Sequence, residues 1–197
     1  MERGRRLPLL RALAAVAAAL VGGAAAPPAA GAAVLMTKSQ ALAEAFPGAR
    51  VERRAFVLTE AQTAAIQARA KAKAGSRLVT AYLAWHGGAL AGAAFFDTRE
   101  VRTMPGTFMI VVAPDTTVAR VDVLAFFEPS EYRPPARWLG LFGGRRLDDG
   151  LWPRRDIRNL SGATLSSRAV TEAVRLALAS YEVLVAGEPV AAGAGKP

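Results

Sequence analysis

The stretch Leu78–Phe96 reads LVTAYLAWHGGALAGAAFF and decides the fold class of the chain. Two runs rich in apolar, aromatic and β-branched residues flank His86-Gly87-Gly88, which is the pattern of a β-hairpin. Two more runs of the same kind follow in the next thirty or so residues. The four expected strands are Val79–Trp85, Ala89–Phe96, Thr107–Val112 and Val118–Phe127. Strands in direct succession predict an antiparallel sheet of about four strands.

Helices are expected on both sides of these strands. Thr37 starts a short helix that Pro47-Gly48 stops after Phe46. Thr59 and Gln62 have the spacing of a capping box, so a second helix is predicted from there to about Ala74, ending at Gly75. The expected elements that remain are an extended segment over Val51–Leu58 and a short helix over Ala136–Phe142.

The last element is the clearest of all. Apolar residues recur at helical spacing from Ala169 to Leu184, while Arg168, Glu172 and Arg175 fall on the other side of the expected helix. With flanking helices and an antiparallel sheet, the chain is predicted to be an α+β protein.

The first 32 residues have the order of a secretory signal. A basic start up to Arg11 is followed by the apolar run Ala12–Val21 and by the small residues Ala30-Gly31-Ala32, so cleavage is expected before Ala33. An uncleaved anchor is the alternative, because Leu7–Ala26 is just long enough to span a bilayer. Either reading places the body of the protein in the periplasm or at the extracytoplasmic face of the membrane.

The organisation expected for the chain has four parts. These are a signal peptide or anchor at residues 1–32, a helix–strand–helix segment at 33–77, a main domain at 78–185 and a flexible tail at 186–197.

Composition excludes several chemistries. The chain has 197 residues, no Cys and a single His, so thiolate metal sites, disulfides and multi-histidine metal clusters are excluded, and we expect no metal site. A hydrolytic triad would have to use His86, which lies in an expected turn. The net charge of +9 favours anionic partners in general, and export argues against nucleic acid.

The segment most suggestive of function is Ser161-Gly162-Ala163-Thr164, which with Ser166 lies at the start of the last helix. One reading is purely structural, with Ser161 or Thr164 capping the helix. The other is functional, because a helix N-terminus offers unpaired N–H groups and a positive dipole end to a phosphate. Gly162 and Ala163 would let that phosphate approach the backbone closely.

S-G-A-T followed by x-Ser resembles the attachment motif of the covalent FMN-binding domain. That domain occurs in a subunit of sodium-translocating NADH:quinone reductases, in Rnf-type electron-transport complexes and in small exported FMN-binding proteins. The resemblance implies a phosphoester between FMN and the hydroxyl of Thr164. It also implies a partner for maturation, a flavin transferase that uses magnesium and FAD.

Features similar to the family extend over roughly residues 78–182. The pattern departs from the family at one point, because Arg158 stands where the transferase signature usually has Asp, and Asp156 lies two positions earlier. Arg158 and Arg102 are candidates to neutralise the FMN phosphate. Candidates for an aromatic bed under the flavin ring are Tyr132, Trp138 and Phe142.

These observations predict an exported flavoprotein that carries electrons between an unidentified membrane or envelope donor and an acceptor. We expect an electron carrier rather than a stand-alone catalyst, and we assign no catalytic residue, because the cofactor supplies the chemistry. The alternative is a non-catalytic binding module of the envelope in which the S-G-A-T segment only caps a helix.

Overall fold

The predicted hairpin is confirmed in the computed structural model, which describes residues 33–186. Strand β3 (Leu78–His86) turns through Gly87 and Gly88 into β4 (Ala89–Glu100), and both glycines have positive φ angles of 56° and 85°. Strands β5 (Pro105–Val112) and β6 (Val118–Phe126) follow as an antiparallel continuation. All four expected strands are therefore present.

Within residues 33–186 the sheet has six strands rather than about four. Its order is β1-β6-β5-β4-β3-β2, and every neighbouring pair is antiparallel. Strand β2 (Arg50–Val57) pairs with β3 along its whole length, and the short β1 (Ala33–Val34) pairs with the end of β6. Both additional strands lie at the edges, where one side of the ladder stays unpaired. Short length in β1 and arginines in β2 are common protections of such edges.

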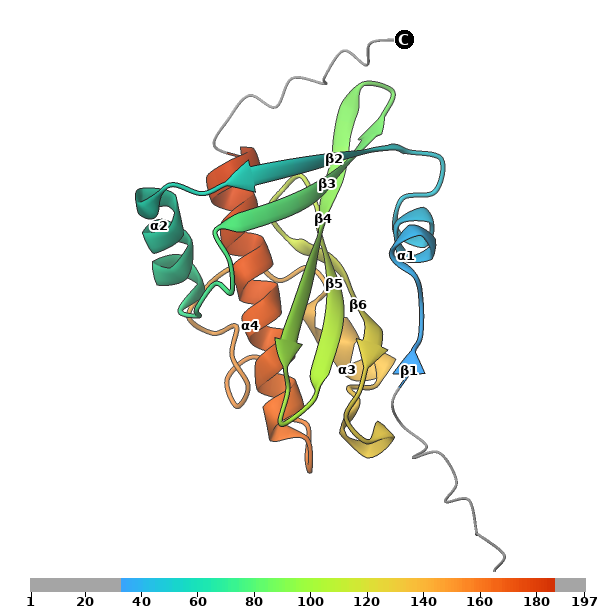
Figure 1. Ribbon diagram of the computed structural model, residues 1–197, viewed down its shortest axis with the longest axis vertical. Coiled ribbons are helices and arrows are strands. Elements are labelled where there is room, and N and C mark those ends of the chain that lie inside the picture. Colours follow the sequence, from blue (N-terminus) through green and yellow to red (C-terminus); the bar gives the residue numbers. More distant parts are fainter. Residues whose placement is uncertain (1–32, 187–197) are drawn as a thin grey trace, which may run out of the picture.

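The two faces of the sheet are covered differently (Figure 1). Helix α4 (Thr164–Tyr181) crosses one face and buries most of its residues in the larger hydrophobic core, with α2 (Glu60–Ala70) beside it. Helix α1 (Lys38–Ala45) covers part of the other face, where Ala41 belongs to a smaller core with residues of β3, β4, β5 and β6. The predicted α+β class is confirmed.

The predicted capping box of α2 is confirmed, and α1 has a capping box as well. Thr37 and Gln40 close the start of α1, and Thr59 and Gln62 close the start of α2. The prediction that α2 extends to about Ala74 is wrong, because the helix ends at Ala70 and Lys71 takes a left-handed φ of 51°.

The last carbonyl groups of α2 accept hydrogen bonds from the side chain of Arg175. Sequence spacing had placed this residue on the exposed side of α4. Arg175 is instead 1% exposed. Its guanidinium donates to the carbonyl oxygens of Ala70 at 2.7 Å and Arg69 at 3.3 Å, and to those of Asp148 and Leu151 in a neighbouring loop. Burial lowers the pKa of Arg175. The helix turns this arginine inward because it satisfies carbonyls that would otherwise lack donors.

Shorter elements complete the description. The predicted helix over Ala136–Phe142 is confirmed as α3 (Ala136–Leu139) and the 3₁₀ turn η2 (Gly140–Phe142). The remaining short elements are η1 (Ser130–Tyr132) and the π-helical turn η3 (Glu182–Ala186). Between residues 33 and 186, no helix is long and apolar enough to cross a membrane. The predicted signal or anchor, and the predicted tail beyond Ala186, lie outside the described residues.

Candidate functional site

The S-G-A-T segment forms a tight turn before α4. The backbone N–H of Ala163 donates to the carbonyl of Leu160 at 3.0 Å, and Gly162 between them has a φ of +78°. A turn with a positive φ at its third residue is the type that favours glycine there. A Cβ at Gly162 would meet no other atom within 4 Å, so the glycine serves the backbone conformation and leaves open space beside it.

Ser167 fixes this turn to the helix. Its Oγ accepts from the N–H of Leu160 at 3.1 Å and donates to the carbonyl of Ala163 at 3.1 Å. Ser167 is fully buried, so these bonds are shielded from water. The position of Thr164, the first residue of α4, is therefore set by contacts on both sides of it.

The start of α4 has no side-chain cap. The N-cap residue is Ala163, so the expectation that Ser161 or Thr164 caps the helix is wrong. The first-turn N–H groups of a helix have no partner within the helix. Thr164 itself is exposed and lies at the positive end of the helix dipole.

A cavity of about 210 Å³ opens beside the Thr164 hydroxyl. Its lining residues are Trp152, Pro153, Arg154, Asn159, Thr164 and Arg168. The Nδ2 of Asn159 donates to the Oγ1 of Thr164 at 3.2 Å. The Oδ1 of the same side chain is buried and has no hydrogen-bond partner among the described residues. An unpaired buried acceptor is costly, typically about 1–3 kcal/mol, so its presence at this cavity needs an explanation.

Ser166, the other polar residue predicted for the site, faces inward. It is fully buried, and its Oγ has no hydrogen-bond partner within residues 33–186.

Arg102 and Tyr132 come together at the turn between β4 and β5. The guanidinium of Arg102 lies 4.3 Å from the centre of the Tyr132 ring, within the range of a cation–π contact. The turn is held by Glu128, which is 3% exposed. Its Oε1 accepts from the backbone N–H groups of Arg102, Thr103 and Met104 at 2.7–2.9 Å.

These backbone hydrogen bonds stabilise the charged form of the carboxylate. The N–H of Thr103 contributes most, followed by those of Met104 and Arg102, and they hold the pKa of Glu128 below its ordinary value of 4.5 although burial acts in the opposite direction.

The β4–β5 turn lies at the same end of the molecule as the start of α4 (Figure 1). An ion pair of 3.0 Å between Arg99 of β4 and Glu172 of α4 ties the two elements together just before the turn. Arg102 is not among the residues that line the cavity at Thr164.

Trp138 and Arg158, two further residues predicted for the site, contact each other and do not line the cavity. Trp138 is 4% exposed, packs edge-on against Phe142, and donates from Nε1 to the carbonyl of Arg158 at 2.6 Å. The side chain of Arg158 is exposed and does not line the cavity. Trp138 and Phe142 therefore support the chain that leads into the S-G-A-T segment, and their rings lie in the core.

The cavity residues that sequence reasoning missed are Trp152, Pro153, Arg154, Asn159 and Arg168. Only Asn159 and Arg168 lie near the S-G-A-T segment in sequence, and neither had a motif to mark it. Arg154 is brought in by the loop, where its N–H donates to the carbonyl of Ile157 at 3.0 Å. Its φ of +68° is a conformation that non-glycine residues rarely adopt.

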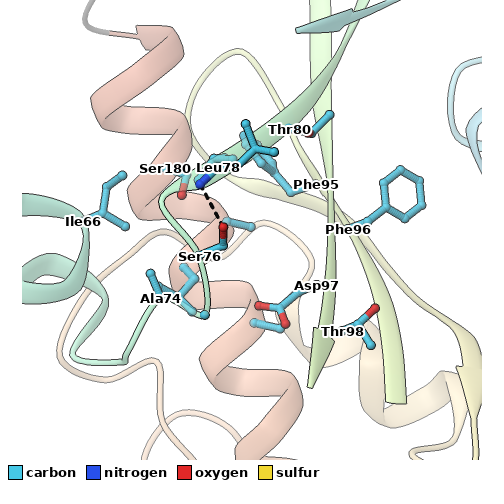
Figure 2. Close-up of a pocket in the computed structure, with 15 residues that line it drawn as sticks. Ile66, Ala74, Ser76, Leu78, Thr80, Phe95, Phe96, Asp97, Thr98 and Ser180 are labelled. Carbon is cyan, nitrogen blue, oxygen red and sulfur yellow. Dashed lines mark hydrogen bonds between the residues drawn. The ribbon is translucent and has the colours of Figure 1, made fainter. Parts of the chain in front are cut away.

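A second cavity, of about 300 Å³, lies far along α4 from Thr164 (Figure 2). Its lining residues belong to α2 and the segment after it, to β3 and β4, and to the second half of α4. In Figure 2 the ring of Phe96 points away from the cavity. None of the residues predicted for the functional site lines it. Within residues 33–186, no group of three or more His, Asp or Glu side chains could hold a metal ion.

This α+β fold therefore places an exposed threonine at an uncapped helix start, a position where backbone N–H groups can bind an anion such as a phosphate. Residues 104–179 match the family model of the FMN-binding domain. The matched segment runs from the β4–β5 turn into α4 and includes Thr164. No curated protein and no solved structure matches the chain.

Proposed function

We propose that this protein is an exported flavoprotein that holds FMN covalently through a phosphoester on Thr164 and transfers electrons in the cell envelope. One observation carries the proposal. Thr164 lies within the segment that matches the FMN-binding domain, and it is exposed at an uncapped helix start, beside a cavity.

The local structure fits a phosphate on Thr164. The open space at Gly162 and the small side chain of Ala163 leave the backbone N–H groups of the first turn accessible. An anion there gains the favourable interaction with the helix dipole, worth about 0.3–1 kcal/mol at an exposed position. The unpaired Oδ1 of Asn159 indicates that the residues around Thr164 have hydrogen-bonding capacity to spare.

Attachment is a phosphoryl transfer from FAD, catalysed by a flavin transferase. The threonine oxygen forms a bond to the phosphorus on the riboflavin side, the pyrophosphate bond breaks, AMP leaves, and the hydroxyl proton is released. The protein keeps FMN less one water, and no oxidation or reduction occurs in this step.

Once attached, FMN supplies the redox chemistry, accepting and passing on electrons. The remaining residues have binding roles in this proposal. Ser161, Gly162, Ala163 and Ser166 shape the attachment point, Arg158 lies near enough in sequence to contribute positive charge, and Trp138 supports the backbone there. Arg102 and Tyr132 are candidates for the edge of the flavin site.

The donor and acceptor in the proposal are membrane or envelope proteins, which suits the predicted export. The alternative of a non-catalytic envelope module depended on the S-G-A-T segment being a helix cap. That support is removed by the absence of a side-chain cap at Ala163.

The test is the intact mass of the full chain, expressed with an active flavin transferase and recovered after export. Wild type should gain the mass of FMN less one water and show flavin fluorescence after denaturation. Thr164→Ala should lose both completely, because the esterified oxygen is gone. Thr164→Ser should retain part of the modification, because the hydroxyl is kept.

Two outcomes would contradict the proposal. Wild type that stays unmodified beside an active transferase excludes covalent FMN, and modification that persists in Thr164→Ala places the flavin elsewhere. Recovery of the protein from the cytoplasm with an intact N-terminus would contradict export.

A further inference from the structure

We propose that Asn159 is the positioning residue for the Thr164 hydroxyl and that Arg154 receives the phosphate in the cavity beside it. This inference rests on the proposed function and assigns residues of this chain to the attachment step. Three observations meet at this place: the contact between Asn159 and Thr164, and, among the described residues, an unpaired oxygen of Asn159 and an arginine of the cavity with no competing partner.

The hydrogen bond between Asn159 and Thr164 can exist both before FMN is attached, when Thr164 has a free hydroxyl, and afterwards, when its oxygen is part of an ester. Its donor is Nδ2 and its acceptor is the Oγ1 of Thr164, at 3.2 Å. A threonine oxygen that becomes an ester oxygen loses its hydrogen and can only accept. The amide donor can therefore keep the same bond before and after transfer, and it leaves the hydroxyl hydrogen free to depart.

The other end of the Asn159 amide also points to a ligand. Its Oδ1 is buried and has no partner among residues 33–186. Buried polar atoms in folded proteins are nearly always paired, so an unpaired acceptor beside an open cavity is suited to a donor that arrives with a ligand. The hydroxyl groups of a ribityl chain are donors of that kind, whereas a phosphate diester offers only acceptors.

Two arginines line the cavity, and they differ in what holds them. The Nε of Arg168 is 2.8 Å from Glu172, which also pairs with Arg99. The guanidinium of Arg154 has no ion pair or hydrogen bond within the described part of the chain. Arg154 is therefore the cation that can pair with a phosphate without first giving up a carboxylate.

The backbone at Arg154 supports the same assignment. Its left-handed φ of +68° would be unstrained for glycine, yet this chain has an arginine there. The N–H of Arg154 bonds to the carbonyl of Ile157, and Pro153 forms a bridge with Ile157. These contacts of the loop hold the backbone of Arg154 in a strained conformation, and the side chain of Arg154 lines the cavity.

The experiment measures the rate of FMN attachment to the purified full chain with flavin transferase and FAD, followed by intact mass. Asn159→Ala should lower kcat for the acceptor protein roughly ten- to a hundredfold while KM changes little, because the hydroxyl is misplaced rather than unbound. Asn159→Asp, which has the same shape but no amide donor, should be at least as slow.

Arg154→Ala should also slow attachment, and Arg154→Lys should restore part of the rate by returning the charge. The matched control is Arg53→Ala, which removes an equal charge from an exposed position on β2 and should attach FMN at the wild-type rate. Unfolding midpoints in urea, measured on the same preparations, should show that all variants are folded.

The outcomes separate this inference from the proposed function. If wild type gains no FMN, the proposed function fails. If wild type is modified and Asn159→Asp keeps or exceeds its rate, the amide is not the donor and the positioning role is wrong. If Arg154→Ala matches Arg53→Ala, the phosphate is held by other groups and the assignment of Arg154 is wrong.

Discussion

Helices α2 and α4 lie side by side on the same face of the sheet, but their N-termini are built in opposite ways. At the start of α2, Thr59 and Gln62 satisfy backbone donors through a complete capping box. At the start of α4, Ala163 offers no side-chain acceptor. Both segments contain residue types that favour caps, and only the first uses them.

The difference shows how a binding position is recognised in this protein. The end of α2 is also closed, because Arg175 donates to its last carbonyls. Polar groups around α2 are thus satisfied by the chain itself. Around the start of α4, Asn159 Oδ1 and Ser166 Oγ lack partners within the described residues, and the first-turn donors have no cap. A helix end left open in this way has room for an external anion.

The β4–β5 turn offers a comparison within the same protein, because a group of backbone N–H donors surrounds an anion in this turn. There, three successive backbone N–H groups surround the carboxylate of Glu128. The chain supplies its own anion to this group of donors, whereas it supplies none to the donors at the start of α4. The following predictions test that contrast, from the largest expected effect to the smallest.

The closed end of α2 should be the most sensitive to mutation. Arg175→Ala removes the donors from several buried carbonyls at once, and we expect a loss of about 3–5 kcal/mol in the free energy of unfolding. Urea unfolding followed by circular dichroism measures this change. Arg175→Lys should recover only part of it, because an ammonium cannot reproduce the planar fork of donors.

Arg168→Ala is the control on the same helix. Its side chain is 70% exposed, so the unfolding free energy should change by no more than about 0.5 kcal/mol. Equal losses at Arg168 and Arg175 would contradict the view that Arg175 closes α2.

Removing the carboxylate of Glu128 should change the free energy of unfolding by an intermediate amount that depends on pH. Glu128→Gln removes the charge that accepts three N–H groups, and we expect a loss of roughly 1–3 kcal/mol at neutral pH. Because the pKa of Glu128 is lowered on folding, its contribution is present above the ordinary value of 4.5 and is lost as the pH falls through the folded-state pKa.

The measurement is the unfolding free energy as a function of pH for both proteins. The difference between wild type and Glu128→Gln should be constant above about pH 6 and should shrink as the pH falls below the ordinary pKa of the carboxyl. A difference that stays constant down to strongly acidic pH would show that the charge of Glu128 does not matter.

The smallest expected effect comes from substitutions at the N-termini of α2 and α4, which compare these two helix starts directly. Thr59→Ala should cost about 1 kcal/mol of unfolding free energy, the usual value of an N-cap. Ser161→Ala in the unmodified protein should cost almost nothing, because Ser161 does not cap α4. A loss at Ser161 as large as that at Thr59 would restore the capping interpretation of the S-G-A-T segment.

Much of the architecture was readable from local pattern. The hairpin around Gly87-Gly88 was predicted from two apolar runs and a turn signal, and the capping box of α2 was predicted from Thr59 and Gln62, three residues apart. Such features depend on contacts between residues close in sequence, so the sequence specifies them without knowledge of the fold.

The errors arose where distant segments meet. The pairing of β2 with β3 completes an edge of the sheet that no local pattern announced. Arg175 was assigned to the exposed side of the last helix by its spacing, although it is buried and donates to carbonyls of α2 and of a distant loop. Arg154 and Trp152 were not considered at all, because only the folded loop brings them to Thr164.

The amino-acid sequence alone determined most of the helices and strands, the S-G-A-T segment and its resemblance to the FMN-binding domain, which the match over residues 104–179 supports. The tertiary structure alone decided which polar groups are satisfied by distant partners. Whether Arg175 is buried depends on which partner carbonyls the fold brings within hydrogen-bonding distance of its guanidinium. Those partners come from segments separated by many residues, and their proximity has no local signature.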